Sequence, residues 1–248
     1  MKSSIVSSSV FEAGDRDDAR FYLPTEFNSK NYPDINWCPL SKLATVAKST
    51  IIPEKNPDEE FNCVNLKDVN EKDGKIKQVH RLLGSKIKGS KVRAHPGDIL
   101  FARIEPSIYN KKIAIVPENI GEIIGSTEFI VLTPRKGVSS KYLFWILRSD
   151  WFSMQITENL MRGSTGRRRL DHRELVRKLV PDVATDTQRE IEEILVSASL
   201  KRDQILMTIE MLMKEADKKI KDTIKNSKPF EVDDHSKKAL QLTLGSAS

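Results

Sequence analysis

Cysteines are few in this 248-residue sequence, and long apolar runs and secretion signals are absent. Its two cysteines, Cys38 and Cys63, cannot supply a disulfide framework or a multi-cysteine zinc site. No apolar run approaches the roughly 18 residues that a membrane-spanning helix needs. The first residues, Met1 to Asp18, contain no apolar stretch as long as that of a secretory signal. These absences predict a cytoplasmic protein without a membrane span.

Motifs that carry catalysis are equally scarce. The sequence has no glycine-rich phosphate loop followed by Lys-Ser/Thr, no Gly-x-Ser-x-Gly elbow and no histidine pair at metal-ligand spacing. It also has no Pro-Pro dipeptide, which the Asn/Asp-Pro-Pro-aromatic motif of methyltransferases requires. We therefore predict a chain that is not an enzyme and that holds no metal or cofactor of its own.

One pattern keeps a magnesium-dependent nuclease open as an alternative. Pro57-Asp58 followed by Asp73-Gly74-Lys75 matches an arrangement in which two carboxylates hold Mg²⁺ and the lysine orients the attacking water. Both aspartates lie in polar segments with the composition of solvated turns. Because Asp-x-Lys is short and 31% of the residues are charged, the pattern arises easily by chance.

The positive charge is concentrated in the middle of the chain. The sequence carries 41 basic and 35 acidic residues, and residues 61–185 hold 23 of the basic and 13 of the acidic ones. A basic region inside a folded domain suits a polyanion, because each neutralised phosphate releases counterions. When charge is the only observation, a solvated lysine-rich surface is the better explanation.

Apolar periodicity predicts an α+β fold with four segments. We expect a disordered N-terminus at 1–15, a globular domain at 16–185, a long helix at 186–227 and a disordered tail at 228–248. Short apolar segments ended by turns or prolines predict strands near 99–104, 112–116 and 128–133, within an irregular mixed sheet, with packed helices following residue 139.

The long helix has the strongest periodic pattern. No Gly or Pro occurs from Thr187 to Asn226, and apolar residues recur at alternating spacings of four and three, broken only by Arg202. A helix of this kind is roughly 60 Å long, and its apolar stripe needs a partner helix. We predict a coiled-coil homodimer, with a surface helix packed on its own domain as the alternative. The predicted seam comprises Ile191, Leu195, Ala198, Ile205, Ile209, Leu212 and Ala216.

Nine short motifs follow one another along the chain. They are Arg16–Tyr22, Trp37–Leu40, Gly97–Arg103, Ile113–Pro117, Gly125–Leu132, Tyr142–Trp145, Gly163–Leu170, Val180–Pro181 and Thr187–Ile191. As an ordered set they resemble the specificity subunits of type I restriction–modification systems, over about residues 16–225, with the target recognition domain and the long conserved helix. Members of that family usually carry two recognition domains and two such helices, so this sequence, with one of each and no internal repeat, resembles half a subunit.

Candidate DNA-binding residues fall in three basic segments. Two patterns suit contact with phosphates and reading of base edges. One is an arginine beside small residues, and the other is a cation beside an aromatic residue and an amide. A solvated basic turn and, for Tyr109, simple packing are the alternatives. The candidates are Arg103, Tyr109, Asn110, Lys111 and Lys112 in the central segment, Arg162, Ser164, Thr165, Arg167, Arg168 and Arg169 in the later one, and Lys86, Lys88 and Arg93 in the first.

The resemblance implies a function and a set of partners. It implies a non-catalytic subunit that reads double-stranded DNA and docks DNA adenine methyltransferase and restriction subunits. S-adenosylmethionine, Mg²⁺ and ATP would then belong to those partners. A homodimer of half-subunits would read a bipartite palindromic site, because a two-fold axis inverts the second copy. A free-standing dimeric DNA-binding regulator is the second hypothesis, and the nuclease is the third.

Overall fold

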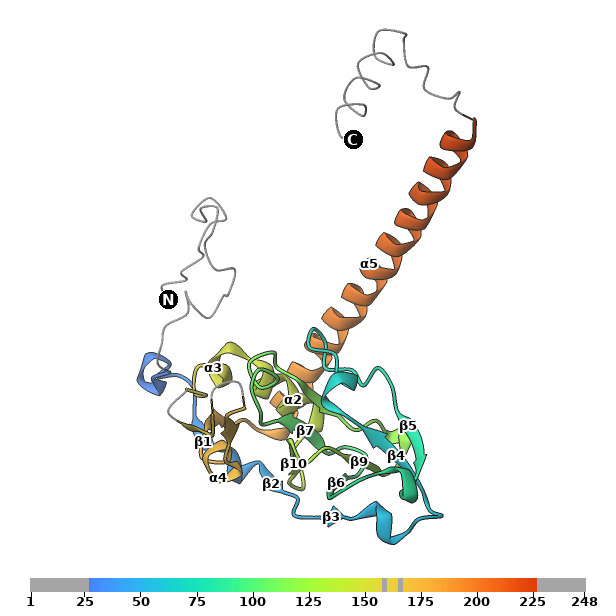
Figure 1. Cartoon of the computed structure of the whole chain (residues 1–248). Helices are drawn as coiled ribbons and strands as arrows, with labels where there is room; N and C mark the ends of the chain where they lie inside the picture. Colours follow the sequence, from blue (N-terminus) through green and yellow to red (C-terminus); the bar gives the residue numbers. More distant parts are fainter. Residues whose placement is uncertain (1–26, 158–159, 165–166, 227–248) are drawn as a thin grey trace, which may run out of the picture. The chain divides into compact units, whose positions relative to one another are not determined.

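The computed structural model describes residues 27–157, 160–164 and 167–226. It divides into two compact units, Met1–Glu193 and Ile194–Ser248 (Figure 1). The two segments predicted to be disordered, 1–15 and 228–248, lie outside the described residues. Within the described ranges, no helix is both long and apolar enough to cross a membrane.

A four-stranded antiparallel sheet forms the centre of the first unit. Its order is β2 (Ala44–Val46), β10 (Phe129–Pro134), β7 (Ile99–Ala102) and β8 (Ile113–Ile115). Side chains alternate between the two faces of a strand, and both faces of β7 and β10 are buried. These two strands therefore read as continuous apolar runs rather than as alternating ones.

Helices cover one face of this sheet. Ile99 and Phe101 of β7 pack in one core with Tyr142 of α2 (Ser140–Arg148) and Phe152 of α3 (Asp150–Ser153). The Oγ of Ser139 caps α2 by accepting a hydrogen bond from the Tyr142 N–H at 3.2 Å.

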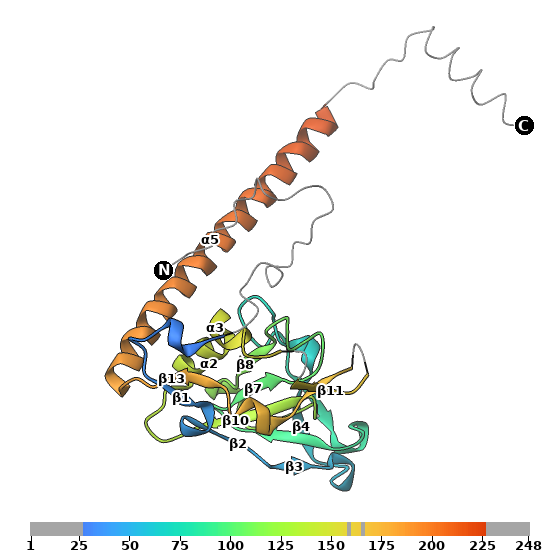
Figure 2. The same cartoon turned by 90° about the vertical axis from the view of Figure 1, so that its left-hand side faces the viewer.

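A five-stranded mixed sheet faces the other side (Figure 2). Leu100 and Ala102 of β7 pack there with Val64, Ala94 and Ile123. The parallel pair in this sheet is β4 with β9. The sheet order is β3 (Thr50–Ile51), β6 (Lys91–Ala94), β9 (Ile123–Gly125), β4 (Glu60–Val64) and β5 (His80–Leu83).

Two short strand pairs complete the first unit. β1 (Trp37–Pro39) pairs with β13 (Leu179–Pro181), and β11 (Met161–Arg162) forms a hairpin with β12 (Arg169–Leu170). The short helix α4 (His172–Leu175) follows the hairpin and is capped by Asp171, whose Oδ1 accepts from the Arg173 N–H at 2.8 Å.

The helix α5 (Thr185–Asn226) has 42 residues and is therefore about 63 Å long. The predicted α+β class with a long C-terminal helix is confirmed. The predicted strands near 99–104, 112–116 and 128–133 correspond to β7, β8 and β10. The strands divide between two main sheets, because β7 and β10 carry apolar side chains for a separate core on each face.

Candidate nucleic-acid interface

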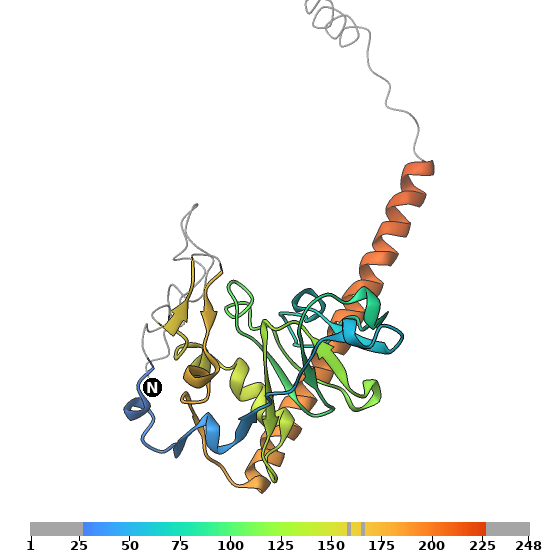
Figure 3. The same ribbon diagram turned by 60° about the horizontal axis from the view of Figure 1, so that its bottom comes forward.

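The β11–β12 hairpin carries most of the arginine-rich segment and is fixed to the end of β7. The Leu170 N–H donates to the Arg103 carbonyl at 2.8 Å, and the Glu105 N–H donates to the Arg168 carbonyl at 3.1 Å. Ile104 and Arg169 form an antiparallel bridge between these two bonds. In Figure 3 the two gold strands of the hairpin lie at one side of the domain. The hairpin is thus a separate two-stranded sheet whose main chain is bonded to the segment that follows β7.

Two of its arginines are held by carboxylates. Arg168 donates from Nε to Glu105 Oε2 at 3.0 Å, and its Nη2 lies 2.9 Å from Oε1. Arg169 donates from Nε to Glu128 Oε2 at 2.8 Å and from Nη2 to Glu128 Oε1 at 2.6 Å. Hydrogen bonding to Glu128 raises the pKa of Arg169 above its ordinary value. Each of these two arginines forms a bidentate ion pair with its glutamate, and the two ion pairs fix the orientation of the hairpin.

Exposed cations remain on the same hairpin. The side chains of Arg162 on β11 and of Arg167 before β12 are exposed and form no ion pair within the described ranges. Ser164 is exposed at the turn beside them, and the predicted contact residue Thr165 lies outside the described residues. Of the predicted arginines, Arg162 and Arg167 are therefore the two available to a phosphate or a base edge.

The neighbouring segment 105–112 is occupied mainly by contacts within the fold. Tyr109 packs against the core under α2. Lys111 donates to Asp150 Oδ1 at 2.8 Å, and Lys112 donates to the Leu66 carbonyl at 3.1 Å. Asn110 is exposed. This segment therefore offers DNA one amide rather than the aromatic, amide and two cations that the sequence pattern predicts.

Arg103 lies at the base of the hairpin. Its Nε is buried and has no hydrogen-bond partner in the described part of the chain. The pKa of Asp171 is lowered mainly by the hydrogen bond from the Arg173 N–H, with a smaller contribution from the charge of Arg103. Arg103 thus contributes positive charge beneath the hairpin.

The first basic segment lies elsewhere on the domain. Lys86 and Lys88 are exposed, whereas Arg93 donates to Glu122 Oε1 at 2.8 Å. Figures 1 and 3 show the short helix η6 (Gly84–Lys86) on the opposite side of the domain from the hairpin. The three predicted segments therefore do not form one continuous surface, and the hairpin and the η6 end are separate candidates.

The predicted seam on α5 is largely open in the single chain. Ile205 is 60% exposed and Ile209 is 49% exposed, and Leu212 and Ala216 are exposed as well. Leu195 is half-buried and Ala198 is exposed. Ile191 packs against the core of the first unit, and it therefore stabilises that unit rather than a seam with a partner helix. The apolar stripe from Leu195 to Ala216 remains for a partner.

The start of α5 is anchored by polar groups. Gln188 is buried, accepts from the Ser139 N–H at 3.0 Å and donates to the Val183 carbonyl at 3.0 Å. Glu192 accepts from Ser139 Oγ at 2.6 Å and from Lys141 Nζ at 2.7 Å. These bonds, chiefly the one from Lys141, lower the pKa of Glu192. This anchor gives the glutamine of the Thr187–Ile191 motif a structural role.

Sequence reasoning missed Glu105 and Glu128, the two carboxylates of the hairpin. Glu105 lies two residues after the motif Gly97–Arg103, and Glu128 lies within the motif Gly125–Leu132, immediately before β10. The sequence shows the isolated acids and the arginine cluster, but it does not show that they pair. Glu105 is 63 residues from Arg168 and Glu128 is 41 residues from Arg169, so no local spacing connects them.

The nuclease pattern falls in two turns. Asp58 is exposed after the short helix η4 (Pro53–Lys55), and Asp73 Oδ1 accepts from the Lys75 N–H at 3.0 Å within its own turn. In the residues that the structure describes, no group of three or more His, Cys, Asp and Glu side chains is arranged to hold a metal ion.

No protein-family model and no curated protein matches the chain in sequence. Solved structures do match it. The HsdS subunit from Thermoanaerobacter tengcongensis is 29% identical, with a TM-score of 0.61, over 75% of this chain and 46% of that one. A chain from a study of complex assembly and conformational transition of the type I R-M system is 23% identical, with a TM-score of 0.63, over 80% of this chain and 51% of that one.

These matches define the fold of the chain. The fold is that of the S (specificity) subunits of type I restriction–modification systems, which confirms the resemblance found in the sequence motifs. The chain spans about half the length of each of these two structures.

Proposed function

We propose that this chain is a non-catalytic DNA-recognition subunit of a type I restriction–modification complex. The observation that carries the proposal is the likeness to the HsdS subunit, which extends over 75% of the chain at 29% identity. The basic middle of the chain supports DNA as the ligand, because basic residues that neutralise phosphates release the counterions condensed on the DNA, and this release favours binding.

The β11–β12 hairpin is the DNA-contacting element of the proposal. Arg162 and Arg167 project exposed guanidinium groups from a hairpin that main-chain bonds and two ion pairs hold in place. A rigid support of this kind reduces the ordering cost of binding. Arg162 and Arg167 contact phosphates or a base edge, and Arg168 and Arg169 position the hairpin.

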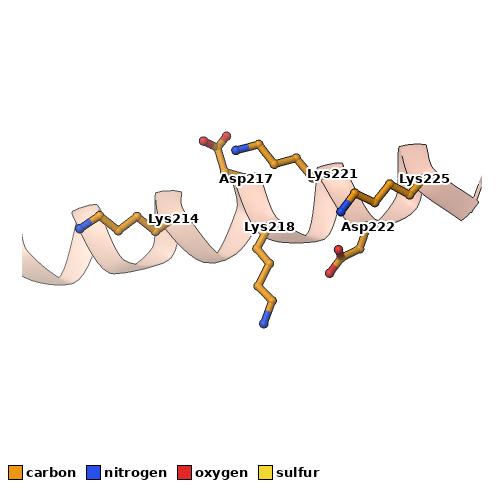
Figure 4. Close-up of a pocket in the computed structure, with 6 residues that line it drawn as sticks. All are labelled: Lys214, Asp217, Lys218, Lys221, Asp222 and Lys225. Atoms are coloured by element: carbon orange, nitrogen blue, oxygen red, sulfur yellow. The ribbon is translucent and has the colours of Figure 1, made fainter.

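A second copy of the chain pairs with α5 in an antiparallel orientation. Residues 185–198 carry four acidic side chains and one basic one, whereas residues 213–226 carry five basic and three acidic ones. Figure 4 shows six charged side chains of the basic end pointing outward from one stretch of α5. Antiparallel pairing sets each acidic end beside a basic end, and parallel pairing sets like charges together. The exposed stripe from Leu195 to Ala216 supplies the seam.

The dimer reads a bipartite palindromic site and docks DNA adenine methyltransferase and restriction subunits. A two-fold axis presents the same hairpin twice in opposite directions, and hence the same short element appears inverted on either side of a spacer. S-adenosylmethionine, Mg²⁺ and ATP belong to the partner subunits in this proposal.

DNA binding by the purified chain tests the proposal. Arg162→Ala with Arg167→Ala should weaken binding and reduce the slope of log K against log salt by up to about 1.8, since each lost phosphate contact removes about 0.9. The matched control is Lys86→Ala with Lys88→Ala, which removes the same charge at the other end of the domain. A reduced slope only in the control would move the DNA face to η6. Absence of salt-dependent binding by the wild type would refute the proposed function.

A further inference from the structure

The two arginine–glutamate pairs of the hairpin differ in exposure. The side chains of Arg168 and Glu105 are 24% and 7% exposed, whereas those of Arg169 and Glu128 are 43% and 21% exposed. Loss of a partner from an enclosed pair leaves an uncompensated buried charge, whereas an exposed pair is screened by water. Glu105 is therefore required by the fold, whereas removal of Glu128 leaves Nε and Nη2 of Arg169 without their carboxylate, and only the 3.3 Å hydrogen bond from Nη1 to the Arg167 carbonyl still holds this side chain in the described part of the chain.

The hairpin register places Arg169 directly opposite Arg162. Directly opposed residues of an antiparallel pair have their side chains on the same face, and like charges there repel. Glu128 neutralises Arg169, so the cross-strand pair presents one uncompensated guanidinium, that of Arg162. Without Glu128 it would present two guanidinium groups side by side, an arrangement that suits a phosphate.

We propose that Glu128 limits sequence-independent DNA binding by holding Arg169 away from the phosphate backbone. The inference rests on the proposed role of the hairpin in DNA contact. Phosphate contacts attract all sequences alike, and each one adds affinity for any duplex. Glu128 occupies both Nε and Nη2 of Arg169, and thus it withholds the donors that a bidentate phosphate contact needs.

Binding of the full chain to a random-sequence duplex at several salt concentrations tests this role. Glu128→Gln should steepen the slope of log K against log salt by about 0.9. Its affinity should then fall about three- to fourfold more than that of the wild type between 50 and 200 mM salt. The matched control is Glu215→Gln, which removes the same charge from an exposed pair with Lys219 on α5 and should leave the slope unchanged.

Two variants show whether Arg169 carries the effect. Arg169→Ala alone should keep the wild-type slope, because Arg169 makes no phosphate contact while Glu128 holds it. Glu128→Gln combined with Arg169→Ala should also return to the wild-type slope. A wild-type slope in Glu128→Gln, or a reduced slope in Arg169→Ala, would overturn the inference. Failure of Arg162→Ala with Arg167→Ala to change the slope would instead count against the hairpin as the DNA face.

Discussion

Replacement of Ile205 and Ile209 by aspartate should dissociate the proposed dimer without unfolding the proposed recognition domain. Complete burial of an isoleucine side chain is worth about 1.5–3 kcal/mol. Ile205 and Ile209 are 60% and 49% exposed in the single chain, and each therefore has about 1 kcal/mol still to gain in a seam. Four such side chains in two copies contribute about 4 kcal/mol, which is roughly a thousandfold in the dissociation constant. Four aspartates in the seam add the cost of burying charge.

Sedimentation velocity over a range of concentrations measures the effect. The wild type should sediment as a dimer and the double variant as a monomer, with the same thermal unfolding transition for the domain. Met207→Asp with Met211→Asp is the matched control, because these exposed residues have the same spacing on the opposite face of α5. A monomeric wild type at high micromolar concentration would refute the reasoning, and so would equal dissociation of the control.

Two further predictions concern the anchor of α5. Gln188→Ala should lower the free energy of unfolding of the domain by about 1–3 kcal/mol, because the Ser139 N–H and the Val183 carbonyl lose their partner. Denaturant titration measures this free energy. An unchanged midpoint would contradict the role of Gln188 in anchoring α5. Glu192 has a lowered pKa, so its contribution to stability is complete above about pH 4.5 and is lost as the pH falls below that value. Glu192→Gln should therefore lose more stability at pH 7 than at pH 3, and equal losses would contradict this sign.

Local patterns of apolar residues predicted the central strands and the long helix of the fold. The apolar runs at 99–104 and 128–133 became the two central strands, and the forty residues without Gly or Pro became α5. The split into two main sheets was not predictable in this way. The parallel pairing of β4 with β9 joins positions some sixty residues apart, and side chains alone do not specify which distant strand will be the neighbour.

The candidate site, too, could be predicted from the sequence only in part. The cations of the hairpin are visible in the sequence, but their partners are not. Arg168 and Arg169 look equivalent to Arg167 in a run of three, and only the distant Glu105 and Glu128 distinguish them. Lys111 and Lys112 likewise look available until the fold brings Asp150 and the Leu66 carbonyl to them.

A methylation map of DNA from cells that carry this protein together with the proposed methyltransferase subunit tests the central proposal most directly. A two-fold dimer of recognition domains predicts a bipartite motif whose two halves are inverted copies. Their centres should lie about one helical turn apart, on the order of 34–36 Å. An asymmetric bipartite motif would contradict the homodimer, and a continuous motif without a spacer would contradict the role of α5 as the element that separates the two recognition domains.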